Sequence, residues 1–275
     1  MTGDLRDALA ADRAIRRRAA AEAVRVPQGL VLRHPELDDV HYLNALLLDA
    51  GAAPADADAI VALTDGWQGD LRHRHVVFDD ERSGEELALA LPGWERTRTC
   101  FMTFSKDPVA VAPDSRARPI SEDEMGGLQL EGLRELAPEV DARSGLVARL
   151  AATQRALRDA TPARCFGAGE PGEPLAANCT LFLDEDVNGR RVATVEEVGT
   201  LERRRGRGLA RAVVLAAVAE AARWGADLIV VPADADDWPQ LMYARLGFTP
   251  AGRQVALTRR LRQRVAGSDS VAGAL

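Results

Sequence analysis

Two glycines among arginines, between a strand-like run and an Ala-rich helix, form a pattern that could bind phosphate. Gly206 and Gly208 lack a Cβ, so the main chain there can adopt left-handed torsion angles and approach a ligand closely. The free amides of such a turn and of a helix N-terminus face one spot, where the helix dipole adds positive charge. The cationic side chains around this turn are Arg203, Arg204, Arg205, Arg207 and Arg211. This spacing predicts a phosphate-binding turn.

Other phosphate-binding patterns fit this turn less well. The loop of nucleotide hydrolases requires Gly-Lys-Ser/Thr, whereas Gly208 is followed by Leu209. The dinucleotide fingerprint G-x-G-x-x-G has Arg211 at its third glycine, where a bulky side chain obstructs close helix–strand packing. A dinucleotide-dependent oxidoreductase, and a βαβ unit whose turn binds no ligand, stay as less favoured alternatives.

The segment 203–208 matches the pattern Arg/Gln-x-x-Gly-x-Gly/Ala and resembles motif A of the GNAT acetyltransferase superfamily. A second segment, 241–248, carries Tyr243 and ends in Gly-Phe, like motif B of that family. A short apolar run lies between them, and the whole order matches the family over about 163–260. The resemblance implies an α/β (α+β) fold with a mixed, mostly antiparallel sheet flanked by helices.

The resemblance also implies acetyl-CoA as co-substrate. In the family, the main chain at the position of Val198 pairs with the pantetheine arm, and the glycine turn binds the pyrophosphate. Asp236 stands where many members carry an Asn that contacts the coenzyme, and Asp lacks the amide donor. The residues expected to bind the coenzyme are Val198, Thr200, Arg203, Arg204, Arg205, Gly206, Arg207, Gly208, Leu209, Ala210 and Asp236.

Acetyl transfer to an amine requires loss of a proton from the acceptor and protonation of the departing thiolate. Tyr243 matches the family position that faces the coenzyme sulfur, so it is the candidate general acid. Glu196 and Glu197 are adjacent carboxylates in an apolar run, and the family's usual base positions, Thr194 and Val192, are not acidic here. Successive strand side chains point to opposite faces, so we expect one carboxylate in the active cleft. Strand parity favours Glu196, whereas a bulge would favour Glu197.

Composition limits the classes of protein that this chain can be. A chain of 275 residues builds one or two domains, and a net charge of −7 argues against a nucleic-acid binder. The cysteines Cys100, Cys165 and Cys179 form no metal-binding spacing, and Cys165 and Cys179 are expected to be packed thiols in a reducing compartment. No run approaches the roughly 20 apolar residues of a membrane span, so we expect a cytoplasmic protein without metal or membrane partner.

The chain divides at a proline-containing segment of low apolar content. We expect an additional N-terminal α/β domain over 1–108, a linker over 109–119 and a GNAT-like domain over 120–262. Residues 263–275 are expected to be a disordered tail. The order of elements in the first half indicates a degenerate copy of the same fold, as in tandem GNAT proteins, with an unrelated α+β cap as the alternative.

The local patterns also predict individual elements. The many Ala and Arg residues predict a helix over 4–24, and apolar spacing predicts another over 37–50. A strand predicted over about 190–200 leads into the glycine turn. Asn188-Gly189 predicts a hairpin turn. The functional prediction is an acetyl-CoA-dependent N-acetyltransferase that acts on a primary amine of a small molecule or peptide. The alternative is a non-catalytic module that binds acyl-CoA.

Overall fold

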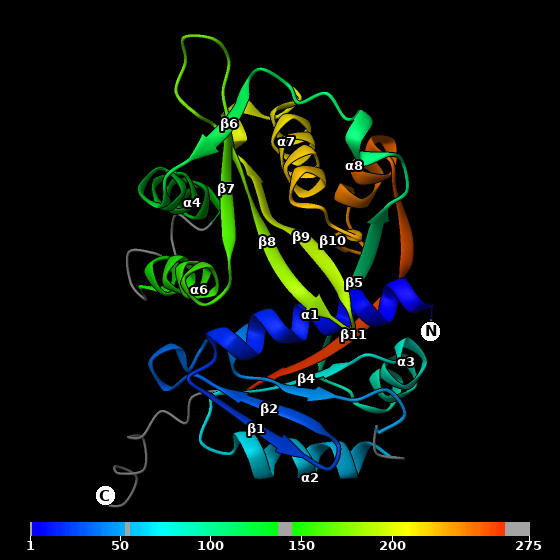
Figure 1. Ribbon diagram of the computed structural model, residues 1–275. Coiled ribbons are helices and arrows are strands. Elements are labelled where there is room, and N and C mark those ends of the chain that lie inside the picture. Colours follow the sequence, from blue (N-terminus) through cyan, green and yellow to red (C-terminus); the bar gives the residue numbers. More distant parts are fainter. Residues whose placement is uncertain (1, 53–55, 137–144, 262–275) are drawn as a thin grey trace, which may run out of the picture.

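The computed structural model describes residues 2–52, 56–136 and 145–261, so the tail predicted over 263–275 lies outside the described residues. Helices and strands alternate along the chain (Figure 1). The helices are α1 (Gly3–Ala19), α2 (Ala57–Gln68), α3 (Glu81–Ala90), α4 (Glu122–Leu136), α6 (Leu146–Ala160), α7 (Leu209–Trp224) and α8 (Pro239–Leu246). The strands are β1 (Glu22–Val26), β2 (Gly29–Arg33), β3 (Leu46–Leu48), β4 (His73–Phe78), β5 (Glu95–Phe104), β6 (Ala117–Ile120), β7 (Ala163–Ala168), β8 (Ala177–Val187), β9 (Arg190–Thr200), β10 (Leu228–Asp234) and β11 (Phe248–Arg260).

The described strands form one continuous sheet, in the order β1-β2-β3-β4-β11-β5-β10-β9-β8-β7-β6. Neighbours are antiparallel except for β3 with β4 and β9 with β10. Asn188 and Gly189 have φ of 56° and 81° and join β8 to β9, which confirms the predicted hairpin turn. The mixed, mostly antiparallel sheet flanked by helices confirms the predicted fold class.

Because side chains alternate between the two faces of a strand, the C-terminal part of the sheet packs against other elements on both faces. Leu181, Val195 and Cys179 pack against α7 in the largest core cluster. Phe182 points to the opposite face and packs with Ile15 of α1 and Leu157 of α6. The described cysteines, Cys100, Cys165 and Cys179, are all buried free thiols, as expected for the last two. Each functional side chain in this part of the sheet therefore lies either on the face of α7 or on the face of α1 and α6.

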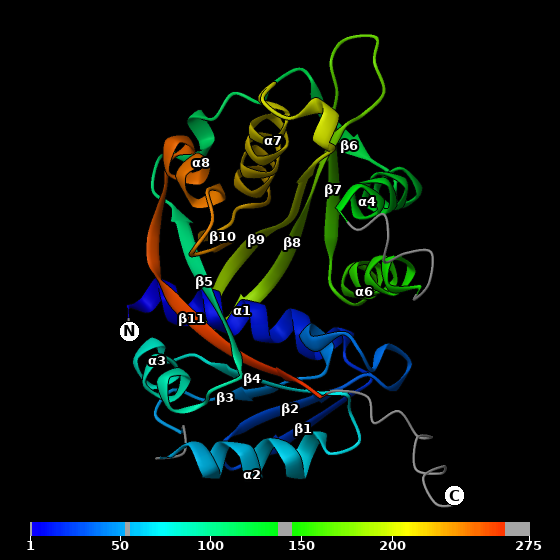
Figure 2. The same cartoon turned by 180° about the vertical axis from the view of Figure 1, so that it is seen from behind.

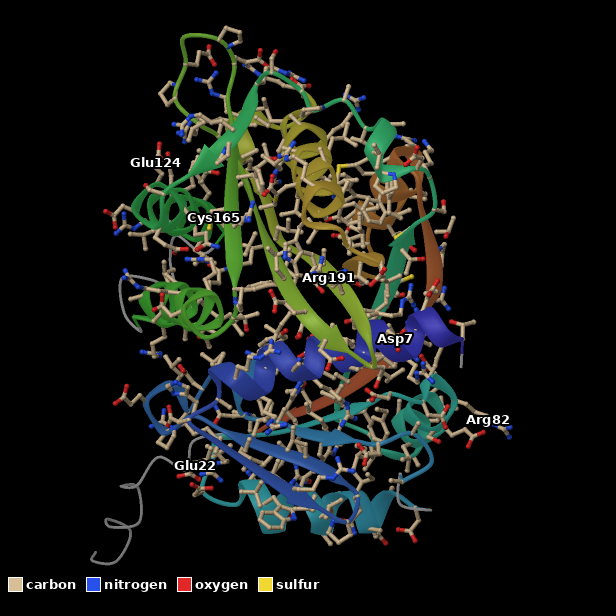
Figure 3. The ribbon with its side chains drawn as sticks, in the orientation of Figure 1. Asp7, Glu22, Arg82, Glu124, Cys165 and Arg191 are labelled. Atoms are coloured by element: carbon tan, nitrogen blue, oxygen red, sulfur yellow. The ribbon has the colours of Figure 1, made fainter. Side chains whose placement is uncertain are left out.

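Helix α1 crosses between the two halves of the molecule (Figures 1 and 2). Its Leu5 and Leu9 pack with Phe101 of β5. Asp7, labelled in Figure 3, is 1% exposed and accepts hydrogen bonds from Asn188 Nδ2 at 2.9 Å and Arg190 Nη1 at 3.0 Å. Helix α1 comes first in the chain, but it packs against the strands of the C-terminal half.

Strands β5 and β11 join the halves. β5 pairs with β10 on one side and β11 on the other, inside the C-terminal part of the sheet. β11 continues from there to pair with β4 of the N-terminal half. Hydrogen-bonded pairing therefore runs across the segment 109–119. The domain boundaries expected from the sequence stay a prediction.

Two predicted elements are wrong. Residues 37–50 form short 3-10 turns followed by β3, not a helix, because Leu46–Leu48 lies between β2 and β4 and is buried on both faces. The first helix ends at Ala19 rather than residue 24, because β1 over Glu22–Val26 pairs with β2. In both places long-range strand pairing overrides a local helical pattern. Among the described helices, none is long and apolar enough to span a membrane.

The N-terminal half repeats one connection of the C-terminal half. β3, α2 and the parallel strand β4 follow one another, as do β9, α7 and the parallel strand β10. This repeat agrees with the expectation of a second, degenerate copy of the fold.

Candidate active site

Strands β9 and β10 separate at the site. They pair only between residues 192–194 and 228–230. β9 then continues to Thr200, while β10 continues to Asp234 as a partner of β5. From Val195 onward, this side of β9 has no strand partner among the described residues. The main chain at Val198 thus has no strand partner on this side among the described residues, and its pairing with the pantetheine arm stays a prediction.

The glycine turn presents unengaged amides at the start of α7. Gly206 and Gly208 have φ of 78° and 77°, and Gly208 is the N-cap of the helix. The amide of Arg205 donates to the Glu202 carbonyl at 3.2 Å, but the amides from 206 to 211 have no acceptor within the described parts of the chain. A Cβ added at Gly206 would meet no atom within 4 Å. The turn therefore offers free donors and the helix N-terminus to open space.

The arginines of the turn divide into two groups. Arg203 forms an ion pair with Glu135 of α4 at 2.8 Å, and Arg204 pairs with Glu173. The ion pairs of these two guanidinium groups hold the turn in place, so the two groups are less available to bind phosphate. Arg205, Arg207 and Arg211 are exposed and form no ion pair shorter than 3.9 Å among the described residues. The expected ring of five available cations is thus reduced to these three.

Arg116, which the sequence analysis missed, supports the turn from outside the motif. Its Nη1 donates to the Arg207 carbonyl at 3.0 Å and to Glu170 Oε1 at 3.1 Å. Hydrogen bonds from Arg116 lower the pKa of Asp114 to about 2. Arg116 and Asp114 lie in the segment taken as a linker, where no local pattern indicated a role.

A β-bulge in β9 determines on which face of the sheet the side chains of Glu196 and Glu197 lie. Asn178 is opposite Gly199 and Thr180 is opposite Glu196, so β9 holds one extra residue. Glu197 has a φ of 55°, and its carbonyl accepts from Asn178 Nδ2 at 2.7 Å. Both glutamate side chains lie on the face of α1, α4 and α6, as their partners below show. The expectation that they point to opposite faces is wrong, because the bulge interrupts the alternation.

Glu197 is held by neighbouring side chains. Its Oε2 accepts from Arg158 Nη1 at 2.7 Å, from Gln129 Nε2 at 2.8 Å and from Thr180 Oγ1 at 2.5 Å. The side chain is 6% exposed, and burial raises its pKa while Arg158 opposes the rise. Glu197 therefore anchors the bulge to α4 and α6 and is poorly placed to accept a substrate proton.

Glu196 differs from its neighbour in its side-chain contacts. It is partly buried, and its side chain forms no hydrogen bond or ion pair with any described residue. Burial and the nearby carboxylates of Asp12 and Glu197 raise its pKa to about 8, and Arg16 opposes the rise. Such a pKa suits a group that exchanges protons near neutral pH. The bulge that was expected to favour Glu197 is present, but Glu197 is held by three donors, so Glu196 is the better candidate for the base.

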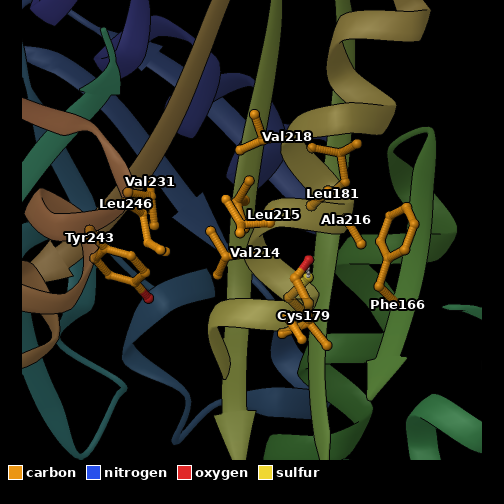
Figure 4. Packing of buried hydrophobic residues seen from close by; sticks show 14 of the residues in the cluster. Phe166, Cys179, Leu181, Val214, Leu215, Ala216, Val218, Val231, Tyr243 and Leu246 are labelled. Atoms are coloured by element: carbon orange, nitrogen blue, oxygen red, sulfur yellow. Dashed lines mark hydrogen bonds between the residues drawn. The ribbon is translucent and has the colours of Figure 1, made fainter. Parts of the chain in front are cut away.

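Tyr243 lies on α8, on the same face of the sheet as α7. It is 5% exposed and contacts Phe248 edge-on, with ring centroids 6.0 Å apart. In Figure 4 its ring lies beside the cluster that contains Val214, and its hydroxyl points away from α8. Burial raises the pKa of the phenol well above its usual value. The hydroxyl has no partner in the described chain and stays protonated at neutral pH.

The other predicted coenzyme residues are placed as follows. Asp236 is exposed, and its Oδ2 accepts from Arg98 Nε of β5 at 3.0 Å. This ion pair occupies the carboxylate that was expected to contact the coenzyme. Thr200 ends β9 with a buried Oγ1 that has no partner, and the Leu209 side chain packs in the core. Leu209 and the partly buried Ala210 therefore contribute their amides to the turn rather than their side chains.

Metal-ligating side chains do not gather at this site. Within residues 2–52, 56–136 and 145–261, no group of three or more His, Cys, Asp or Glu side chains could hold a metal ion.

The sequence of the C-terminal half matches the model of the acetyltransferase (GNAT) family over residues 132–248. This range runs from within α4 to the end of α8 and includes the glycine turn, both glutamates and Tyr243. No curated protein sequence matches the chain.

Solved structures share the fold. A functionally unknown conserved protein from Staphylococcus epidermidis superposes with a TM-score of 0.62 at 10% identity, over 87% of this chain and 93% of its own. A GCN5-related N-acetyltransferase from Kribbella flavida gives 0.58 at 21% identity, over 94% and 96%. A tandem GNAT protein from the clavulanic acid biosynthesis pathway, without AcCoA, gives 0.50 at 16%, over 74% and 67%. Residues 132–248 of this chain therefore form a domain of the acetyltransferase (GNAT) family.

Proposed function

We propose that this protein transfers the acetyl group of acetyl-CoA to a primary amine by direct attack within a ternary complex. The observation that carries the proposal is the turn at Gly206 and Gly208. It points unengaged amides at open space beside the unpaired edge of β9. Amides at a helix N-terminus bind phosphate groups, and an unpaired strand edge can pair with an amide-containing arm.

The reaction assigns one role to each of two titratable side chains. Glu196 accepts a proton from the ammonium group of the acceptor. The amine nitrogen attacks the thioester carbonyl carbon, and the C–S bond breaks as the C–N bond forms. The departing thiolate takes a proton from the Tyr243 hydroxyl, and the second proton that the attacking nitrogen loses restores this hydroxyl. No covalent intermediate on the protein is needed.

The coenzyme assignment is tested by ligand-induced stabilisation. Acetyl-CoA at 100 times its Kd is expected to stabilise the folded protein by about 2.7 kcal/mol, whereas NAD(P) at equal concentration produces no shift. Differential scanning fluorimetry measures both ligands. Stabilisation by NAD(P) and not by acetyl-CoA would instead support the dinucleotide-dependent oxidoreductase.

The general-acid assignment is tested with Tyr243→Phe. The variant is expected to lower kcat by about 10²- to 10⁴-fold, the range for loss of a general acid, with acetyl-CoA binding nearly unchanged. Steady-state kinetics and calorimetry give the two quantities. A native rate in Tyr243→Phe means that this assignment is wrong. Coenzyme binding without turnover of any amine by the native protein supports the alternative, a non-catalytic acyl-CoA-binding module.

The setting of the reaction is part of the same proposal. We place it in the cytoplasm, because Cys100, Cys165 and Cys179 are unpaired buried thiols, typical of a reducing compartment. The acceptor is a small-molecule or peptide amine. Neither nucleic acid nor a membrane surface is proposed as a partner, since the net charge is −7.

A further inference from the structure

Arg16 of α1 is a buried cation held in one orientation. Its side chain is 9% exposed, and its Cζ lies 3.9 Å from the centroid of the Tyr42 ring. Its Nε lies 2.9 Å from Asp12 Oδ2, and the Tyr42 hydroxyl donates to Asp12 Oδ1 at 3.0 Å. Stacking on one side and an ion pair at the inner edge fix the plane of the guanidinium.

The outer edge of the same guanidinium is unused. Arg16 Nε is fully enclosed, whereas Nη1 and Nη2 retain contact with solvent and have no acceptor among the described residues. The nearby His75 is buried and its pKa is lowered by burial, so it adds no charge at neutral pH. Burial of a guanidinium group with unpaired donors lowers the stability of the folded protein unless an acceptor forms hydrogen bonds with those donors. The two Nη groups therefore form a preoriented fork for an anion.

This fork lies near the candidate base. The charge of Arg16 acts on the pKa of Glu196, and Glu196 in turn raises the pKa of Arg16, although no direct ion pair joins them. Both side chains approach from opposing elements, α1 of the N-terminal half and β9 of the C-terminal half. Ile15, the neighbour of Arg16, packs with Phe182 of β8, and Phe182 is opposite Thr194 of β9, two residues before Glu196. Helix α1 therefore covers, next to Arg16, the face of β9 that carries Glu196.

We infer that Arg16 binds a carboxylate of the acceptor, so that the acceptor is an amine that also carries a carboxylate group. This inference rests on the proposed acetyl transfer. The fork of Nη1 and Nη2 matches the two oxygens of a carboxylate. A dianionic phosphate fits less well than a monoanionic carboxylate, because the Asp12 carboxylate already lies beside the Arg16 guanidinium and repels further negative charge. A molecule with one ammonium near Glu196 and one carboxylate at Arg16 matches both charges.

The experiment compares pairs of acceptors that differ only in the carboxylate, such as free amino acids and their amides. The native protein is expected to acetylate the carboxylate member with a higher kcat/KM. Arg16→Met is expected to reduce this preference by about 10- to 100-fold, mainly through KM, since a hydrogen bond to a charged group contributes about 1.5–3 kcal/mol. Arg17→Met, an exposed position on the same helix, is the matched control and keeps the preference.

The outcomes separate the inference from the proposed function. Equal kcat/KM for both members in the native protein, or an unchanged preference in Arg16→Met, overturns the inference. If no amine is acetylated, the proposed function fails, and calorimetric titration of the native protein and Arg16→Met with the same pairs then decides the inference alone. If Arg16→Met does not fold, Arg16→Lys replaces it, because a point charge without the planar fork should weaken the preference too.

Discussion

At the scale of single residues, neighbouring side chains of identical chemistry receive opposite assignments. Glu196 and Glu197 share one face because of the bulge in β9. Arg158 and two further donors bind Oε2 of Glu197, whereas Glu196 lies near the negative charge of Asp12 without a direct partner among the described residues. Opposite charge favours the ionised carboxylate, and burial with like charge favours the protonated form. The pair is thus differentiated by what each side chain contacts.

The pH dependence of the rate follows from Glu196. The carboxyl must be deprotonated to accept a proton, and its pKa is raised to about 8 by burial, Asp12 and Glu197, with Arg16 opposing. We therefore expect kcat/KM to rise with pH and to level off only above about pH 8. Glu196→Gln should lower kcat/KM by about 10²- to 10⁴-fold and remove this part of the profile. Profiles on one acceptor compare the two proteins, so the titration of the amine itself is common to both. An identical profile in Glu196→Gln would exclude Glu196 as the base.

At the scale of secondary structure, the turn before α7 depends on two left-handed residues. Gly206 and Gly208 allow the main chain to expose its amides directly before the helix begins. Arg203 and Arg116 then hold this geometry from both sides, through Glu135 and through the Arg207 carbonyl. The turn is therefore fixed before any ligand binds, which lowers the conformational entropy lost on binding.

Substitution of Gly206 tests the turn through its torsion angles alone. Since a Cβ at this position would meet no atom within 4 Å, Gly206→Ala introduces only the cost of a left-handed Ala, about 1–2 kcal/mol. We expect a Kd for acetyl-CoA raised by roughly 5- to 30-fold if the chain relaxes away from φ of 78°. Calorimetry measures the Kd. Gly127→Ala, in the exposed surface of α4, is the control and leaves the Kd unchanged. An unaltered Kd in Gly206→Ala, at a stability lowered by the cost of the left-handed Ala, would mean that the turn keeps its torsion angles, and an unaltered Kd at unaltered stability would contradict the prediction.

At the scale of the whole molecule, the two halves share their sheet and their site. β5, which precedes the 109–119 segment, lies between β10 and β11, and Ile15 of α1 packs with Phe182 of β8. Both the scaffold and the acceptor side of the proposed site thus depend on residues from each half. Such sharing predicts cooperative unfolding as one unit.

A fragment of residues 109–262 tests this sharing. It lacks β5, so β10 loses its partner over 230–234 and β11 loses its partner over 248–258. The fragment also lacks α1, which exposes the apolar residues that pack against Leu5 and Leu9. We expect it to show no cooperative thermal transition, whereas the full chain shows one transition by calorimetry. A fragment that melts cooperatively and binds acetyl-CoA would establish an independent domain at the boundaries expected from the sequence.

The sequence by itself determined the features that short segments encode. The two glycines predict the turn, because residues without Cβ are needed where φ is positive. Asn188 and Gly189 predict the hairpin for the same reason. Tyr243 and the order of elements around it indicate the family and the fold class. Each of these depends on torsion angles or spacing within a few residues, which a single sequence displays directly.

Tertiary structure alone decided the rest, because it depends on contacts between distant segments. The triple-leucine segment 46–48 becomes a strand through pairing with β2 and β4, against its local helical spacing. The bulge at Glu197 depends on Asn178 across the strand pair, and the bracing of Arg203 depends on α4. In the sequence, Arg16 cannot be distinguished from the surface residues of an Arg-rich helix. The tertiary structure shows that it is buried against Tyr42. The spacing of residues within one segment does not reveal these distant partners. The acceptor side of the proposed site can therefore be described only from the tertiary structure.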